Sequence, residues 1–115
     1  MGYNVERDRD LEEKLEALRR AVTQYGLVMT AHADEEAREE DISLQDIHEV
    51  IVNGEIIEDY PTHRRGPCCL IHARVSSGRN LHLVATTERI PPRIITVYEP
   101  KHPYWLTPRE RRKER

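Results

Sequence analysis

The chain has 115 residues, of which 37% are hydrophobic and 34% are charged, and its net charge is −3. This length fits a single domain, residues 1–115, although the hydrophobic share is below the roughly 45–50% of typical globular proteins. The sequence has neither the ~18-residue hydrophobic run of a membrane span nor a signal-peptide pattern, so we expect no membrane partner and a cytoplasmic location. The small hydrophobic share favours a surface that pairs with a partner, which includes a homodimer.

The charges are divided unevenly along the chain. Residues 1–60 contain 17 acidic and 6 basic side chains, a net of −11, whereas residues 61–115 contain 4 acidic and 12 basic side chains, a net of +8. A basic half can form a face that binds a polyanion such as RNA. The alternative is that the two halves neutralise each other, within one molecule or across a dimer.

Three helices are expected in the first half of the chain. Residues 8–25 carry an apolar stripe with alternating steps of four and three residues, typical of a helix that packs on a sheet: Leu11, Leu15, Leu18, Val22 and Tyr25. After a brief apolar link at residues 27–30, residues 32–41 form a strongly acidic helix. The third helix begins at the capping residue Ser43, with Asp46 at the capping-box position, and Gly54 ends it as a left-handed cap.

Four strands are expected in the second half, at residues 55–60, 69–75, 80–86 and 93–98. The register of the middle two follows from their hydrophobic pattern. A three-residue loop with Gly78 in the left-handed position sorts the apolar residues of both strands onto one face. The other face then carries His72, Arg74, Asn80 and His82. We expect residues 1–7 and 107–115 to be flexible tails.

The two cysteines, Cys68 and Cys69, are adjacent, so on a strand they point to opposite faces and a bridge between them is not expected. We interpret them as reduced packing residues. A zinc site from Cys69, His72 and a further histidine is the alternative, but one C-x-x-H without a second pair is a weak signal. We therefore expect no metal and no other cofactor.

The segments AHADEEAREEDIS, NGEIIEDYP, GPCCLIHAR, LHLVAT and IITVYEP, followed by Trp105, resemble the domain-of-unknown-function family 4258 over residues 30–105. The resemblance implies a RelE-like α+β fold, with N-terminal helices packed on one face of a four-stranded antiparallel sheet. It implies kinship with toxins of bacterial toxin–antitoxin modules such as the BrnT and MqsR groups. It further implies a cognate antitoxin of the zinc-finger and helix-turn-helix type, and an endoribonuclease that cuts messenger RNA without a metal.

Some positions match the family and others depart from it. His32, the EDYP turn at residues 58–61, His82 and Tyr98 match the family's pattern. Many members carry arginines in the helix after His32, where this chain has Glu36 and Glu40, and this change removes positive charge that could hold RNA. Many members also have an apolar residue and a glycine where this chain has His72 and Ala73. The pair of His72 with His82 is therefore peculiar to this chain.

Metal-free RNA cleavage needs a base, an acid and a cation that stabilises the phosphorane. Imidazoles suit the first two roles and guanidinium suits the third, so the candidate catalytic residues are His82, Arg74, Tyr98 and His72. The candidate RNA-binding residues are Arg64, Arg65 and Lys101, and His32 and Tyr60 are candidate structural residues. The alternatives are a half-buried His82 bonded to a strand carbonyl, tyrosines that only pack, and arginines in a solvated loop. If these hold, the chain is a catalytically inactive protein-binding module of the same fold.

Overall fold

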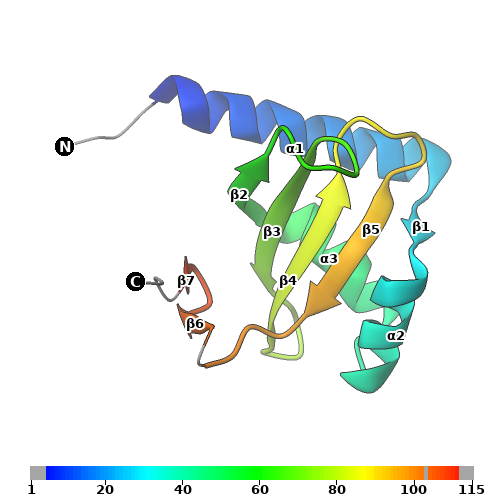
Figure 1. Ribbon diagram of the computed structural model, residues 1–115, viewed down its shortest axis with the longest axis vertical. Coiled ribbons are helices and arrows are strands. Elements are labelled where there is room, and N and C mark those ends of the chain that lie inside the picture. Colours follow the sequence, from blue (N-terminus) through cyan, green and yellow to red (C-terminus); the bar gives the residue numbers. More distant parts are fainter. Residues whose placement is uncertain (1–4, 103, 112–115) are drawn as a thin grey trace.

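Helices fill the first half of the chain and strands the second, as the sequence pattern predicted (Figure 1). The computed structural model describes residues 5–102 and 104–111, with side chains from residue 9 onward. The helices are α1 (Val5–Tyr25), α2 (Ala31–Glu39) and α3 (Leu44–Asn53). The strands are β1 (Val28–Met29), β2 (Glu55–Tyr60), β3 (Cys68–Arg74), β4 (Asn80–Thr86), β5 (Arg93–Tyr98), β6 (Trp105–Thr107) and β7 (Glu110–Arg111). No described helix combines the length and the hydrophobicity that crossing a membrane requires.

The main sheet has five strands in the order β1-β5-β4-β3-β2, and β6 and β7 form a separate two-stranded sheet. The four expected strands are present and antiparallel to their neighbours, but the expected total of four is wrong, because β1 adds a fifth strand parallel to β5. The expected link at residues 27–30 thus contains a strand. The predicted register is confirmed: His72 lies opposite His82, and Gly78 in the connecting loop has φ 93°.

The helices cover one face of the sheet and bury the hydrophobic core there (Figure 1). The stripe of α1 contributes Leu15 and Leu18, and α3 contributes three fully covered residues: Ile47, Val50 and Ile51. The strands contribute the residues that alternate toward the helices: Cys69, Ile71, Ala73, Leu81, Leu83 and Ala85. The core therefore depends on the same alternation that set the register. The other side of the sheet is called the outer face from here on.

Helix α3 is held at both ends by polar contacts. The expected capping box is present, because the Ser43 side chain accepts from the Asp46 backbone and the Asp46 side chain accepts from the Ser43 backbone. At the other end, Arg19 of α1 donates to the carbonyls of Ile51 and Gly54 at 2.8 and 3.0 Å. A guanidinium at a helix C-terminus satisfies carbonyls that have no partner within the helix and complements the helix dipole. Arg19 thereby fixes α1 against α3.

The acidic helix α2 lies along the edge of β5. Glu36 accepts a hydrogen bond from the backbone N–H of Val97 at 3.1 Å and from the Thr96 hydroxyl, and Glu40 accepts from the N–H of Glu99 at 3.0 Å. Along the first part of β5 the same edge is paired by β1. The two glutamates therefore serve as acceptors for strand donors that would otherwise be unpaired. This role gives a structural reason for acidic residues at positions where the resemblance led us to expect arginine.

Gly54 ends α3 in a different way from the one predicted. Its φ is −86° and its ψ is −178°, so it adopts an extended conformation rather than a left-handed one. The position is tight instead: a Cβ built there would lie 2.3 Å from the carbonyl oxygen of Val50 and 2.6 Å from Cγ2 of Ile71. Glycine is required here by the close approach of α3 to β3.

The Gly54→Ala substitution should destabilise the protein by about 2 kcal/mol, because the new methyl group forces α3 away from the sheet. Urea unfolding measures the effect as a lower midpoint. Val52→Ala is the matched control, since Val52 is 60% exposed on the same helix and its replacement should shift the free energy of unfolding by less than about 0.5 kcal/mol. Equal midpoints for Gly54→Ala and the native chain would contradict the close approach.

Candidate functional site

The candidate site is a row of three side chains across the outer face. The register pairs His72 of β3 with His82 of β4, and His82 with Tyr98 of β5. The ring centroids of His72 and His82 are 5.6 Å apart, and those of His82 and Tyr98 are 5.3 Å apart. Next to His72, the row continues to Asn80, whose Oδ1 accepts a hydrogen bond from Nε2 of His72 at 3.0 Å. Three of the four candidate catalytic residues are thus brought together.

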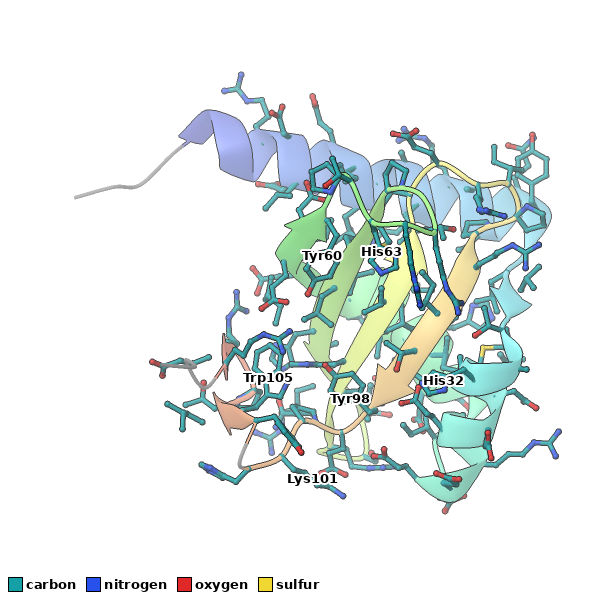
Figure 2. All side chains as sticks on the ribbon, in the orientation of Figure 1. His32, Tyr60, His63, Tyr98, Lys101 and Trp105 are labelled. Atoms are coloured by element: carbon teal, nitrogen blue, oxygen red, sulfur yellow. The ribbon has the colours of Figure 1, made fainter. Side chains whose placement is uncertain are left out.

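The hairpin of β6 and β7 packs against His82 in this row, and Figure 2 shows its Trp105 beside the part of the sheet that carries Tyr98. The Trp105 ring lies edge-on to the His82 ring with centroids 4.3 Å apart, and Trp105 is only 4% exposed. The Arg111 guanidinium lies over the Trp105 ring, 4.5 Å from the ring centroid. Residues 107–111, expected to belong to a flexible tail, form part of this hairpin, and residues 5–7, expected to belong to the other tail, begin α1; residues 1–4 and 112–115 lie outside the described part of the chain.

Two ion pairs join the hairpin to β2. Arg109 contacts Glu55 at 2.7 Å, and Arg111 contacts Glu58 at 2.8 Å. Glu58 also accepts a hydrogen bond from the Tyr60 hydroxyl. Burial opposes the charge on Glu58, but the hydrogen bonds from Arg111 and Tyr60 prevail and hold its pKa below the ordinary value. Burial and the bond to Glu58 raise the pKa of Tyr60, so its phenol stays protonated and continues to donate. Tyr60 therefore holds Glu58, which in turn contacts Arg111 of the hairpin.

His82 is fully enclosed beneath this cover, with 0% of its surface exposed. Its Nε2–H donates to the carbonyl oxygen of Pro108, and its Nδ1 accepts from the Tyr98 hydroxyl at 3.2 Å. Burial is the main reason why the pKa of His82 falls to about 4, and burial also raises the pKa of Tyr98. At neutral pH His82 is therefore an uncharged imidazole with both nitrogens occupied. An RNA hydroxyl cannot reach it while the hairpin is in place.

The remaining candidates lie apart from the row. Arg74 is exposed at the end of β3, and Lys101 is exposed after β5. Arg64 and Arg65 are exposed in the loop before β3, at the end of the sheet opposite to the row. His32 is 63% exposed at the start of α2, where its Nε2 lies 3.4 Å from Glu36 (Figure 2). The exposed cations therefore do not join the row in a single site.

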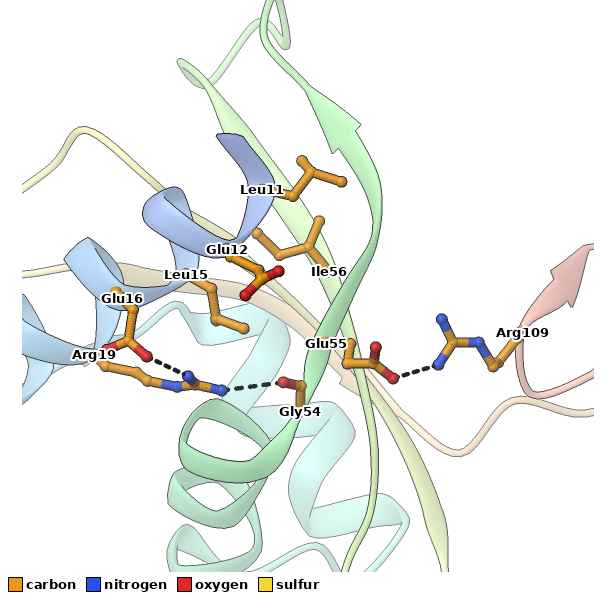
Figure 3. Close-up of a pocket in the computed structure, with 9 residues that line it drawn as sticks. All are labelled: Leu11, Glu12, Leu15, Glu16, Arg19, Gly54, Glu55, Ile56 and Arg109. Carbon is orange, nitrogen blue, oxygen red and sulfur yellow. Dashed lines mark hydrogen bonds and ion pairs between the residues drawn. The ribbon is translucent and has the colours of Figure 1, made fainter. Parts of the chain in front are cut away.

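A pocket of about 610 Å³ lies between helix α1 and strand β2 (Figure 3). Its floor is apolar, formed by Leu11, Leu15 and Ile56. Its rim carries three carboxylates and two guanidiniums: Glu12, Glu16, Glu55, Arg19 and Arg109. Both guanidiniums are paired, Arg19 with Glu16 and Arg109 with Glu55. The excess of carboxylates makes this pocket unsuited to RNA.

The thiols of Cys68 and Cys69 are free and buried, and burial raises the pKa of Cys69 to about 12. Cys69 lies in the core beneath the helices, whereas His72 is on the outer face. The zinc alternative that paired them is therefore wrong. Within residues 5–102 and 104–111, no group of three or more His, Cys, Asp and Glu side chains is arranged to hold a metal ion.

Comparison with protein families matches residues 29–99 to the family described as "Domain of unknown function (DUF4258)". The chain belongs to this family. No curated protein and no solved structure matches the chain. The DUF4258 match contains the row of His72, His82 and Tyr98, whereas α1 and the β6–β7 hairpin lie outside it. The sequence analysis missed the hairpin as part of the site, although Trp105 stood at the end of the pattern that carried the resemblance.

Proposed function

We propose that this chain is the toxin-like component of a bacterial toxin–antitoxin module, with a RelE-like fold, and that it cuts messenger RNA on the outer face without a metal. The row of two imidazoles and one phenol carries this proposal. Those groups occur together on the face that the helices leave uncovered, and the exposed Arg74 lies on the same strand as His72, two residues further along. The net charge of +8 on residues 61–115 supports attraction of a polyanion to this side of the molecule.

In the proposed reaction an imidazole removes the proton of a ribose 2′-hydroxyl, and the 2′-oxygen attacks the adjacent phosphorus. A second protonated group gives its proton to the departing 5′-oxygen. His82 and His72 are the base and the acid, Tyr98 orients His82 through Nδ1, and Arg74 stabilises the charge on the phosphorane. Because Trp105 and Pro108 occupy His82, the hairpin has to move away before RNA is cut.

The proposed partner is a cognate antitoxin of the zinc-finger and helix-turn-helix type, bound over the outer face. The support is geometric and electrostatic. Arg74 at the end of β3 and Arg65 in the loop before β3 are exposed guanidiniums that an acidic segment complements. Such a partner would hold the hairpin against His82, where Trp105 and Pro108 contact it, and would exclude RNA from the row.

Induction of the native chain in bacterial cells should arrest growth and fragment messenger RNA within one generation. A double variant, His72→Ala with His82→Gln, should be harmless, because it removes both proton-transfer groups while keeping a polar side chain at the buried position. Arg20→Gln, an exposed change on α1, serves as the control and should remain toxic. Circular dichroism confirms that each variant is folded. Growth and intact RNA with all three forms would contradict the nuclease.

A second candidate function is a catalytically inactive protein-binding module. One observation favours it: His82 has no exposed surface, and both of its ring nitrogens bond groups of the chain itself. This pattern is that of a histidine that supports structure. In this case purified protein should leave RNA intact even after the hairpin contact is removed by Trp105→Ala. Cleavage by that variant would exclude the module.

A further inference from the structure

A small pocket opens where β4 ends and β5 begins, at the opposite end of the sheet from the histidine row. Its volume is about 150 Å³, and six residues line it: Thr30, Arg65, Thr86, Arg89, Arg93 and Ile95. They come from four separate segments of the chain, so the fold rather than local sequence assembles the pocket. Sites that hold a whole small molecule have volumes of roughly 300–1,000 Å³. This pocket is therefore large enough for one functional group of a ligand.

The lining carries three guanidiniums and no carboxylate. None of the three, Arg65, Arg89 and Arg93, belongs to an ion pair among the described residues, whereas Arg19, Arg79, Arg109 and Arg111 all do. The acidic residue nearest in sequence, Glu88, does not line the pocket. Guanidinium keeps its charge at any physiological pH, so the pocket concentrates a charge of about +3 that repels itself unless an anion enters.

The pocket also contains a hydroxyl group, that of Thr86, that can donate a hydrogen bond to a ligand. Thr86 is 1% exposed, and its hydroxyl oxygen accepts the backbone N–H of Arg93 at 2.9 Å. Among the hydrogen bonds of the described residues, none uses the proton of this hydroxyl, which remains available to an acceptor in the pocket. The Thr30 hydroxyl is already used, since it donates to the carbonyl of Ile94 at 2.8 Å and accepts from the N–H of Ala33. Thr30 also caps α2, so the positive end of that helix dipole lies at the pocket wall.

We propose that this pocket binds a terminal phosphate group, that is, a phosphomonoester. A terminal phosphate carries close to two negative charges and three acceptor oxygens, which three guanidinium forks and one hydroxyl can satisfy. An internal phosphodiester carries one charge and two such oxygens, and it is attached on two sides, so it matches a small pocket with three guanidiniums less well. If the proposed function is right, the ligand is the 5′-phosphate of an RNA; this last identification rests on that function, whereas the phosphate site itself does not.

The test compares two short 2′-O-methyl oligonucleotides that cannot be cut at the 2′-position, one with a 5′-phosphate and one with a 5′-hydroxyl, both labelled at the 3′ end. Fluorescence anisotropy with the full chain should give about tenfold tighter binding of the phosphorylated form. Arg89→Gln and Arg93→Gln should each remove that preference. Arg20→Gln, an exposed change on α1 outside the pocket lining, should keep it. Thermal unfolding of each variant confirms that the fold is retained.

The other phosphate sources form a second arm, in which inorganic phosphate and a nucleoside 5′-monophosphate compete with the labelled probe. Equal affinity for the two oligonucleotides, unchanged by Arg89→Gln, would overturn the phosphate site while leaving RNA binding intact. Binding of the nucleoside monophosphate that depends on Arg89 and Arg93, without binding of either oligonucleotide, would support the phosphate site and overturn the proposed action on RNA.

Discussion

Replacing Trp105 with alanine should raise the pKa of His82 from about 4 toward the ordinary value of 6.5. The reason is that burial is the main cause of the low value, and Trp105 is the ring that lies directly on His82, 4.3 Å away between centroids. The same change should lower the free energy of unfolding by about 3 kcal/mol, since a nearly enclosed indole is lost. The chemical shifts of the His82 ring, followed by NMR between pH 3 and 8, measure the pKa.

Leu106→Ala provides the matched control for this experiment. Leu106 is the next residue of β6 and is 48% exposed, so its truncation should leave the pKa of His82 near 4 and cost little stability. A pKa that stays near 4 in Trp105→Ala would mean that groups other than the hairpin enclose His82. The proposed role of the hairpin as the cover of the site would then be wrong.

The stability of the native chain should fall by about 3 kcal/mol as the pH decreases from 6.5 to 4, through His82 alone. Its pKa is about 4 in the folded state and 6.5 in the unfolded state, so the unfolded chain binds the proton first. Each pKa unit of difference corresponds to about 1.36 kcal/mol, so the contribution of His82 is fully present above 6.5 and is lost as the pH falls toward 4. Urea unfolding at several pH values measures this slope.

Two variants isolate the contribution of His82. His82→Gln has no group that titrates in this range, so its stability should change much less between pH 6.5 and 4. His48→Gln removes an exposed histidine of α3 and should retain the slope of the native chain. If His82→Gln and the native chain lose the same free energy over this range, His82 does not remain neutral in the folded protein, and its enclosure would have to be less complete than described.

Most of the main sheet could be predicted from local patterns. The opposition of His72 and His82 followed from sorting apolar and polar residues by strand alternation, since only one register placed Ala73 opposite Leu81. Strand β1 could not be predicted in the same way. It has two residues and is paired in parallel with β5, more than 60 positions later, so no local alternation marks it.

The site was less predictable than the sheet for a related reason. The tail from residue 107 was interpreted as frayed because it is rich in arginine, a composition typical of solvated ends. Its partners are Glu55 and Glu58, more than 50 residues earlier, and these ion pairs help to hold the hairpin over His82. Arg89 and Arg93 likewise gave no local signal. They became a candidate site only when the fold placed them beside Arg65.

The glutamates of α2 have a consequence for self-assembly. One margin of the sheet is a two-residue strand, and beyond it the donors of Val97 and Glu99 are already bonded to Glu36 and Glu40. A foreign strand finds no continuous template on that side. Growth of the sheet by strand addition is thus restricted to the β2 side. Two copies that paired through their β2 strands would form a closed dimer. The edge formed by β1 and β5 could not pair with a further copy in either of them, so the dimer would not extend into a fibre.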